Sequence, residues 1–116
     1  MLSDVKISVE KTFSASTQNK DSITGHNYRV GIAINAITDS CFDDIVKSDD
    51  IDNLIIPMNN ILLNSKFKVP SATNLAKYLA LKVMRLKENI TDVTVSVYET
   101  DTYCSTITVS RKRLYQ

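Results

Sequence analysis

One histidine and two cysteines stand out as side chains that could bind a metal or transfer protons near neutral pH. His26 is the only histidine, and Cys41 and Cys104 are the only cysteines. Because an imidazole titrates near neutrality, His26 could contact a ligand or act as an acid or base, although a solitary histidine at a strand start can equally be structural. Two distant cysteines form neither a disulfide framework nor a zinc ribbon, so we expect reduced thiols in a cytoplasmic protein.

The composition is that of an ordinary globular domain without a general affinity for polyanions. The 116 residues are 43% hydrophobic and 23% charged, with a formal net charge of +1. That length suffices for one hydrophobic core, so residues 1–116 are predicted to form a single domain. We expect the basic cluster of Arg111, Lys112 and Arg113 to be solvated, without a nucleic-acid partner. No apolar run approaches the about 18 residues of a membrane span, and no signal peptide is expected.

Alternating apolar and polar residues predict four β-strands. These strands are expected at residues 5–13, 27–38, 93–98 and 103–110. The polar stretch 17–24 is predicted to be a loop between the first two strands. Asp101 and Thr102 predict a tight turn that joins the last two strands in a hairpin.

Two amphipathic segments between the strand pairs predict helices. One lies within 39–64, and Pro57 is expected to end it. The clearer one covers 71–89, where apolar residues recur at helical spacing and Ser71 or Thr73 can cap the first turn. The order strand, strand, helix, helix, strand, strand predicts an α+β domain, with an antiparallel four-stranded sheet and helices on one face. The open sheet edges favour a ring-like homo-oligomer.

Five segments, taken together and in order, resemble the 6-pyruvoyl-tetrahydropterin synthase and 6-carboxytetrahydropterin synthase family of tetrahydropterin and queuosine biosynthesis. The segments are Phe13-Ser14-Ala15-Ser16-Thr17, Thr24-Gly25-His26-Asn27-Tyr28, 58–64, 70–76 and Val97-Tyr98-Glu99-Thr100. The resemblance implies a T-fold whose sheets join in an oligomeric barrel, as a homotrimer or homohexamer in the cytoplasm. It also implies a pterin-like ligand.

The zinc site of that family is missing at the matching positions. Three histidines bind zinc in the family, and the resemblance places Thr17, Thr24 and His26 there. A catalytic zinc needs three nitrogen, sulfur or carboxylate ligands, and threonine hydroxyls are poor substitutes. We therefore predict no metal site and no cofactor.

The catalytic groups of the family are replaced as well. Its nucleophilic cysteine corresponds to Lys20, and its Asp-His pair corresponds to Asn59 and Asn60. Amides do not exchange protons near neutral pH, so they cannot act as general acid or base. The family's zinc-dependent reaction is not expected to run, and Lys20 and His26 are left as the catalytic candidates.

A glutamate that holds the pterin is the family feature that remains. In the family it accepts hydrogen bonds from a ring N–H and an exocyclic amine, a strong bidentate contact, and Glu99-Thr100 matches its motif. Without the resemblance, Glu99 would be an ordinary exposed residue at a strand end. The predicted ligand-binding residues are Glu99, Thr100, His26, Asn59 and Asn60.

These residues leave three hypotheses for the function of the chain. The preferred one is binding of a pterin- or purine-like heterocycle through Glu99 without zinc-dependent lyase activity. The second is a metal-free aldolase or lyase acting on a dihydropterin, with Lys20 as base after its pKa has been lowered by burial or a neighbouring cation. The third is a non-catalytic oligomeric scaffold with a vestigial pocket.

Overall fold

The sheet and helices follow the predicted order. The computed structural model describes residues 2–39 and 45–111. Its elements are β1 (Ser3–Asn19), β2 (Ser22–Thr38), α1 (Ser48–Ile55), the 3₁₀ helices η2 (Ile56–Met58) and η3 (Leu63–Ser65), α2 (Ala72–Met84), β3 (Ile90–Thr100) and β4 (Tyr103–Ser110). The strands lie in the order β1-β2-β3-β4, and every neighbouring pair is antiparallel. The predicted α+β class is confirmed.

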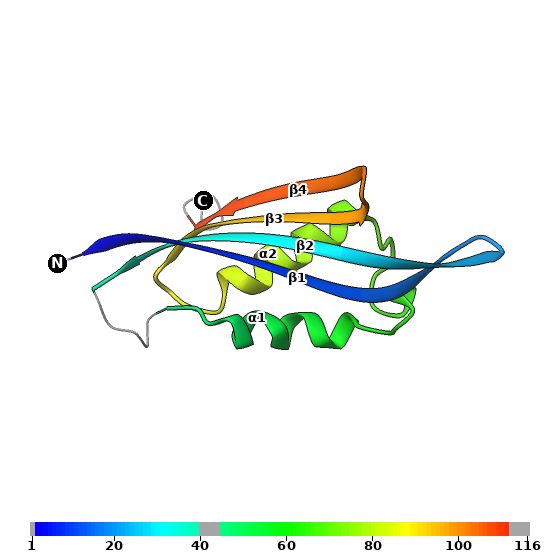
Figure 1. The fold of residues 1–116 in the computed structure, drawn as a ribbon, viewed down its shortest axis with the longest axis horizontal. Helices are drawn as coiled ribbons and strands as arrows, with labels where there is room; N and C mark the ends of the chain where they lie inside the picture. Colours follow the sequence, from blue (N-terminus) through cyan, green and yellow to red (C-terminus); the bar gives the residue numbers. More distant parts are fainter. Residues whose placement is uncertain (1, 40–44, 112–116) are drawn as a thin grey trace.

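Both helices cover the same face of the sheet. Helix α2 packs across β3 and β4, and α1 packs against β1 (Figure 1). The strand residues that point toward them are apolar and alternate with polar ones, because successive side chains of a strand lie on opposite faces. The buried core includes Val30, Ile32 and Val95 of the sheet and Leu75 and Leu79 of α2.

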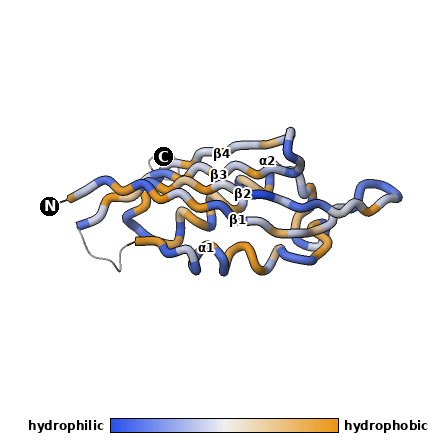
Figure 2. Tube along the Cα trace, in the orientation of Figure 1, coloured by the Kyte–Doolittle hydropathy of each residue, from blue (hydrophilic) through white to orange (hydrophobic). Residues whose placement is uncertain are grey.

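The hairpin of β1 and β2 is longer than the sequence pattern predicts. The loop predicted at 17–24 is wrong, because both strands continue through it and the register pairs Thr17 with Thr24 and Asn19 with Ser22. A two-residue turn remains, in which Lys20 takes a φ of 55°, as tight hairpin turns require. This end of the hairpin projects beyond the helices and is largely hydrophilic (Figures 1 and 2), so it lacks the apolar alternation by which strands are recognised.

The helix boundaries differ in part from the predicted ones. Pro57 lies in η2 directly after α1, which agrees with its expected role. Ser71 caps α2, since its hydroxyl accepts a hydrogen bond from the Asn74 backbone N–H at 3.1 Å. The predicted end of α2 at residue 89 is wrong, because the helix stops at Met84. The guanidinium of Arg111 donates hydrogen bonds to the Met84 and Lys87 carbonyls at this end.

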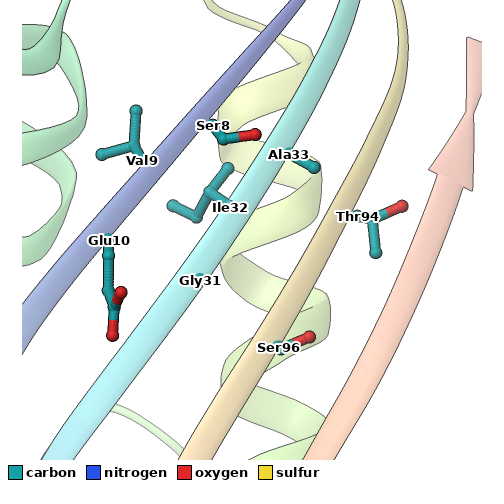
Figure 3. A pocket seen from close by; sticks show the side chains of 8 residues that line it. All are labelled: Ser8, Val9, Glu10, Gly31, Ile32, Ala33, Thr94 and Ser96. Carbon is teal, nitrogen blue, oxygen red and sulfur yellow. The ribbon is translucent and has the colours of Figure 1, made fainter.

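The other face of the sheet carries polar and small side chains and has no helix over it in the described residues. Figure 3 looks onto this face, where Glu10 and Thr94 surround a hollow of about 400 Å³ above Gly31 and Ala33. The exposed thiol of Cys104 lies on β4, whereas Cys41, Lys112 and Arg113 fall outside the described residues. In the two described ranges, no helix is both long enough and apolar enough to cross a membrane.

Candidate functional site

A polar cluster lies where the helix-covered face of the sheet reaches the projecting hairpin. Along β2, this face runs from Val30 through Tyr28 to His26, and along β1 it ends at Thr17. Because residues i and i+2 of a strand share a face, the alternation that buries the core also places these polar side chains at its open end. Glu99 joins them from the end of β3.

His26 is the centre of this cluster. Its Nε2 atom lies 3.3 Å from Oγ1 of Thr17 and 3.5 Å from Oε1 of Glu99. The side chains of His26 and Glu99 are 16% and 32% exposed, so the pair is partly shielded but still reachable from solvent. The Thr17 hydroxyl and the Glu99 carboxylate both lie beside the same imidazole nitrogen.

Tyr28 is the inner neighbour of this pair. Its ring stacks on that of Phe13, with the ring centroids 4.8 Å apart. The centroid of the His26 ring lies 5.5 Å from that of Tyr28. The residue is 1% exposed, and its hydroxyl has no hydrogen-bond partner in the described part of the chain. Burial and, second, the negative charge of Glu99 raise the pKa of Tyr28 to about 12. Its hydroxyl is therefore neutral at physiological pH.

A pocket of about 350 Å³ opens beside His26. Its walls come from Ser14 and Ser16 of β1, from Gly25, His26 and Asn27 of β2, and from Asn60 of the connection between η2 and η3. This size lies within the range of small-molecule sites. His26 is thus one of the residues that line the pocket and also contacts Glu99. Glu99 itself does not line the pocket.

The connection that carries Asn59 and Asn60 is fastened to the outer edge of β1. The Asn60 backbone N–H donates to the Ser14 carbonyl at 2.6 Å, and the Ser14 N–H donates to Oδ1 of Asn59 at 3.0 Å. Further along, the side-chain amide of Asn64 both accepts from and donates to the backbone of Gln18. The Asn59 amide therefore holds the pocket wall in place, whereas Asn60, at a φ of 61°, faces the pocket.

The remaining predicted site residues lie apart from the cluster. Thr100 stabilises the turn between β3 and β4, because its hydroxyl accepts hydrogen bonds from the backbone N–H groups of Thr102 and Tyr103. Lys20 lies exposed in the turn at the tip of the long hairpin. Several cross-strand residue pairs lie between this turn and His26. The structure thus brings His26 together with Glu99 and places Asn60 at the same pocket.

Sequence reasoning overlooked Tyr28 as a neighbour of the site. The one available signal was its position two residues after His26 on the same strand face. Nothing in the sequence indicates that its hydroxyl would be buried without a partner, because that depends on what packs around it.

The donor atoms at this end of the sheet do not fit a zinc ion. Thr17 and Thr24 are direct cross-strand partners, and Thr24 shares a strand face with His26. The three positions therefore form one patch, yet two of them offer only hydroxyls. Within residues 2–39 and 45–111, no three His, Cys, Asp or Glu side chains lie close enough to hold a metal ion. A catalytic zinc requires three such ligands.

Comparison with known proteins finds likeness in structure but not in sequence. No protein-family profile matches the chain, and no curated protein matches it by sequence. The structure of Caenorhabditis elegans 6-pyruvoyl tetrahydropterin synthase superposes with a TM-score of 0.73 at 17% identity, covering 93% of this chain and 97% of that one. The Plasmodium falciparum enzyme gives a TM-score of 0.69 at 14% identity, covering 93% and 99%.

The chain has the fold of the 6-pyruvoyl tetrahydropterin synthases. The predicted T-fold is confirmed in its antiparallel sheet of four strands and its two helices. A dihydroneopterin aldolase from Burkholderia thailendensis, solved with bound guanine, shares the fold more distantly. Its TM-score is 0.57 at 10% identity, covering 93% of this chain and 90% of the aldolase. The chain thus has the synthase fold although most of the aligned residues differ.

Proposed function

We propose that this chain is a 6-pyruvoyl-tetrahydropterin synthase-like protein that binds a pterin- or purine-like heterocycle through Glu99, without zinc-dependent lyase activity. The observation that carries the proposal is the placement of Glu99. Its carboxylate lies 3.5 Å from His26 and remains 32% exposed at the open end of the covered face. His26 is also one of the residues that line the adjacent pocket.

The chemistry of a carboxylate favours a particular edge of the ligand. Two oxygens can accept two parallel hydrogen bonds from a ring N–H and a neighbouring exocyclic amine, a charge-assisted and planar contact. Pterins and guanine both present such an edge. The aldolase of the same fold was solved with guanine, which makes guanine a suitable probe alongside pterin.

The absence of lyase activity is inferred from the groups that would have to perform it. The zinc positions hold Thr17, Thr24 and one imidazole. The amide of Asn59 accepts a backbone hydrogen bond and has no proton to exchange near neutral pH. The aldolase alternative gains no support, because Lys20 lies exposed at the hairpin tip, whereas a lysine base needs burial or a neighbouring cation.

The proposal includes self-association into a homotrimer or homohexamer through a closed barrel. Strands β1 and β4 are the two edges of the sheet. The connection at 59–64 covers the outer edge of β1 from Ser14 to Gln18. Before Ser14, β1 pairs with β2 on one side and has no strand on its outer side among the described residues. Pairing of this edge with β4 of another copy would satisfy the backbone groups of both. Light scattering on the purified protein measures the subunit number.

Calorimetric titration with guanine and with pterin tests the ligand proposal. The parent protein should bind at least one of them, and Glu99→Gln should weaken binding by about 10- to 100-fold, because hydrogen bonds to a charged group contribute about 1.5–3 kcal/mol. Glu10→Gln is the matched control, since Glu10 pairs with Arg29 at 3.3 Å on the other face of the sheet. That variant should bind like the parent.

Two results would decide against this function. A parent protein that binds neither compound leaves the scaffold hypothesis as the better account, especially if the oligomer is intact. Equal weakening by Glu10→Gln and Glu99→Gln would show a general charge effect in place of a specific anchor.

A further inference from the structure

The imidazole of His26 contacts the carboxylate of Glu99 at the open end of the helix-covered face. Its Nε2 atom lies 3.5 Å from Oε1 of Glu99. In the part of the chain that the structure describes, His26 is the sole hydrogen-bonding or ion-pairing partner of the Glu99 carboxylate. The neighbouring Tyr28 hydroxyl is buried and makes no hydrogen bond there.

We propose that His26 is a positioning residue that holds the Glu99 carboxylate in the orientation needed to grip the heterocycle. The inference rests on the proposed function and adds a second residue to it. A glutamate side chain has three rotatable bonds, and a partly exposed one at a strand end samples several rotamers. Binding must then pay for their loss, whereas a carboxylate already fixed by a neighbour binds more tightly.

The geometry around Nε2 explains how the imidazole can do this. When the proton is on Nε2, the ring donates toward Glu99, and Thr17 Oγ1 at 3.3 Å lies beside the same nitrogen. The ring is itself restrained, because it is 16% exposed and contacts the buried Tyr28 ring. A restrained donor gives direction to the flexible carboxylate.

Two substitutions of His26 distinguish the effect of its hydrogen-bond donor from the effect of its side-chain volume. In His26→Gln the terminal amide retains an N–H donor at about the place of Nε2, whereas His26→Leu keeps an apolar side chain of similar reach and removes the donor. Titration with guanine, or with pterin if the parent prefers it, should show about tenfold weaker binding for His26→Leu. Binding by His26→Gln should stay within about threefold of the parent.

The inference fails if His26→Leu binds like the parent, or if His26→Gln is as weak as His26→Leu while both variants unfold at the parent's temperature. In either case Glu99→Gln still reports separately on the anchor itself. Should the parent bind neither compound, the proposed function falls and the ligand role of His26 falls with it.

A measurement without ligand tests the contact directly. Because His26 is the only histidine, its imidazole signals in an NMR spectrum report on this site alone. Glu99→Gln should shift these signals, and Glu10→Gln should leave them in place. Unchanged imidazole signals in Glu99→Gln would overturn the claim that His26 holds Glu99.

Discussion

The middle and the end of the helix-covered sheet face differ in chemistry although they belong to the same strands. In the middle, Val30, Ile34 and Val95 are fully buried beneath the helices. At the end, Thr17, His26 and Glu99 occupy equivalent facing positions but remain partly exposed. The middle is stabilised by removal of apolar surface from water, whereas the end retains polar groups that can exchange water for a ligand.

Tyr28 marks the boundary between these two regions. Its ring belongs to the apolar middle and stacks on Phe13, while its hydroxyl reaches the polar end without gaining a hydrogen-bond partner in the described residues. A buried polar group without a partner is costly. The middle of this face is therefore built for stability, and its end is not.

The largest effect on stability is expected in the middle. Leu79→Ala removes a fully buried side chain of α2 and leaves a cavity, so the free energy of unfolding should fall by about 2–5 kcal/mol. Urea denaturation followed by circular dichroism measures it. Thr17→Ala at the polar end is the contrasting variant and should cost less than about 1 kcal/mol. Equal losses would erase the distinction between the two regions.

A second prediction converts the polar end into a metal site. Thr17→His combined with Thr24→His places two imidazoles on cross-strand partners beside His26, which gives three ligands on one patch. The double variant should bind Zn²⁺, and an excess of a hundred times the Kd should raise stability by about 3 kcal/mol. Thermal melts with and without chelator measure the gain. The parent should show none, and a double variant without a gain would mean that the three positions do not converge.

The smallest effect is expected at the boundary. Tyr28→Phe removes the buried hydroxyl that has no partner in the described residues, so stability at neutral pH should be unchanged or higher by about 1 kcal/mol. A loss of more than that would show that the hydroxyl makes a stabilising contact.

The difference in stability between the parent and Tyr28→Phe should also depend on pH. Because the pKa of Tyr28 is raised to about 12 from 10.0, the folded protein retains this proton while the unfolded chain releases it. The contribution of this group to the free energy of unfolding is constant below pH 10 and declines as the pH rises from 10 toward 12. The stability of the parent should therefore fall across this window relative to Tyr28→Phe. Parallel denaturation curves would contradict the raised pKa.

The fold followed from the sequence wherever local periodicity was strong. The alternation in β3 and β4, the turn at Asp101 and Thr102 and the Ser71 cap are local signals, and all three are present in the structure. The end of the first hairpin was missed, because its polar residues show no apolar alternation. That ribbon is fastened by the amide of Asn64, which contacts Gln18 from a distant segment.

The sequence was sufficient to predict which residue types form the site, but not which contacts they make. The sequence indicated both His26 and Glu99 as site residues, and the structure shows that Glu99 contacts His26. Asn59 was expected at the ligand, yet its amide accepts a hydrogen bond from the Ser14 backbone. Amide side chains pair with whatever backbone group lies beside them, and only the folded chain decides which group that is.

The sequence by itself determined which side chains share a strand face and that the zinc positions hold hydroxyls, since both depend only on residue type and local spacing. Only the tertiary structure decided that His26 meets Glu99 and that the Tyr28 hydroxyl is buried. These contacts depend on the register between strands, which is set by pairing and core packing over the whole sheet.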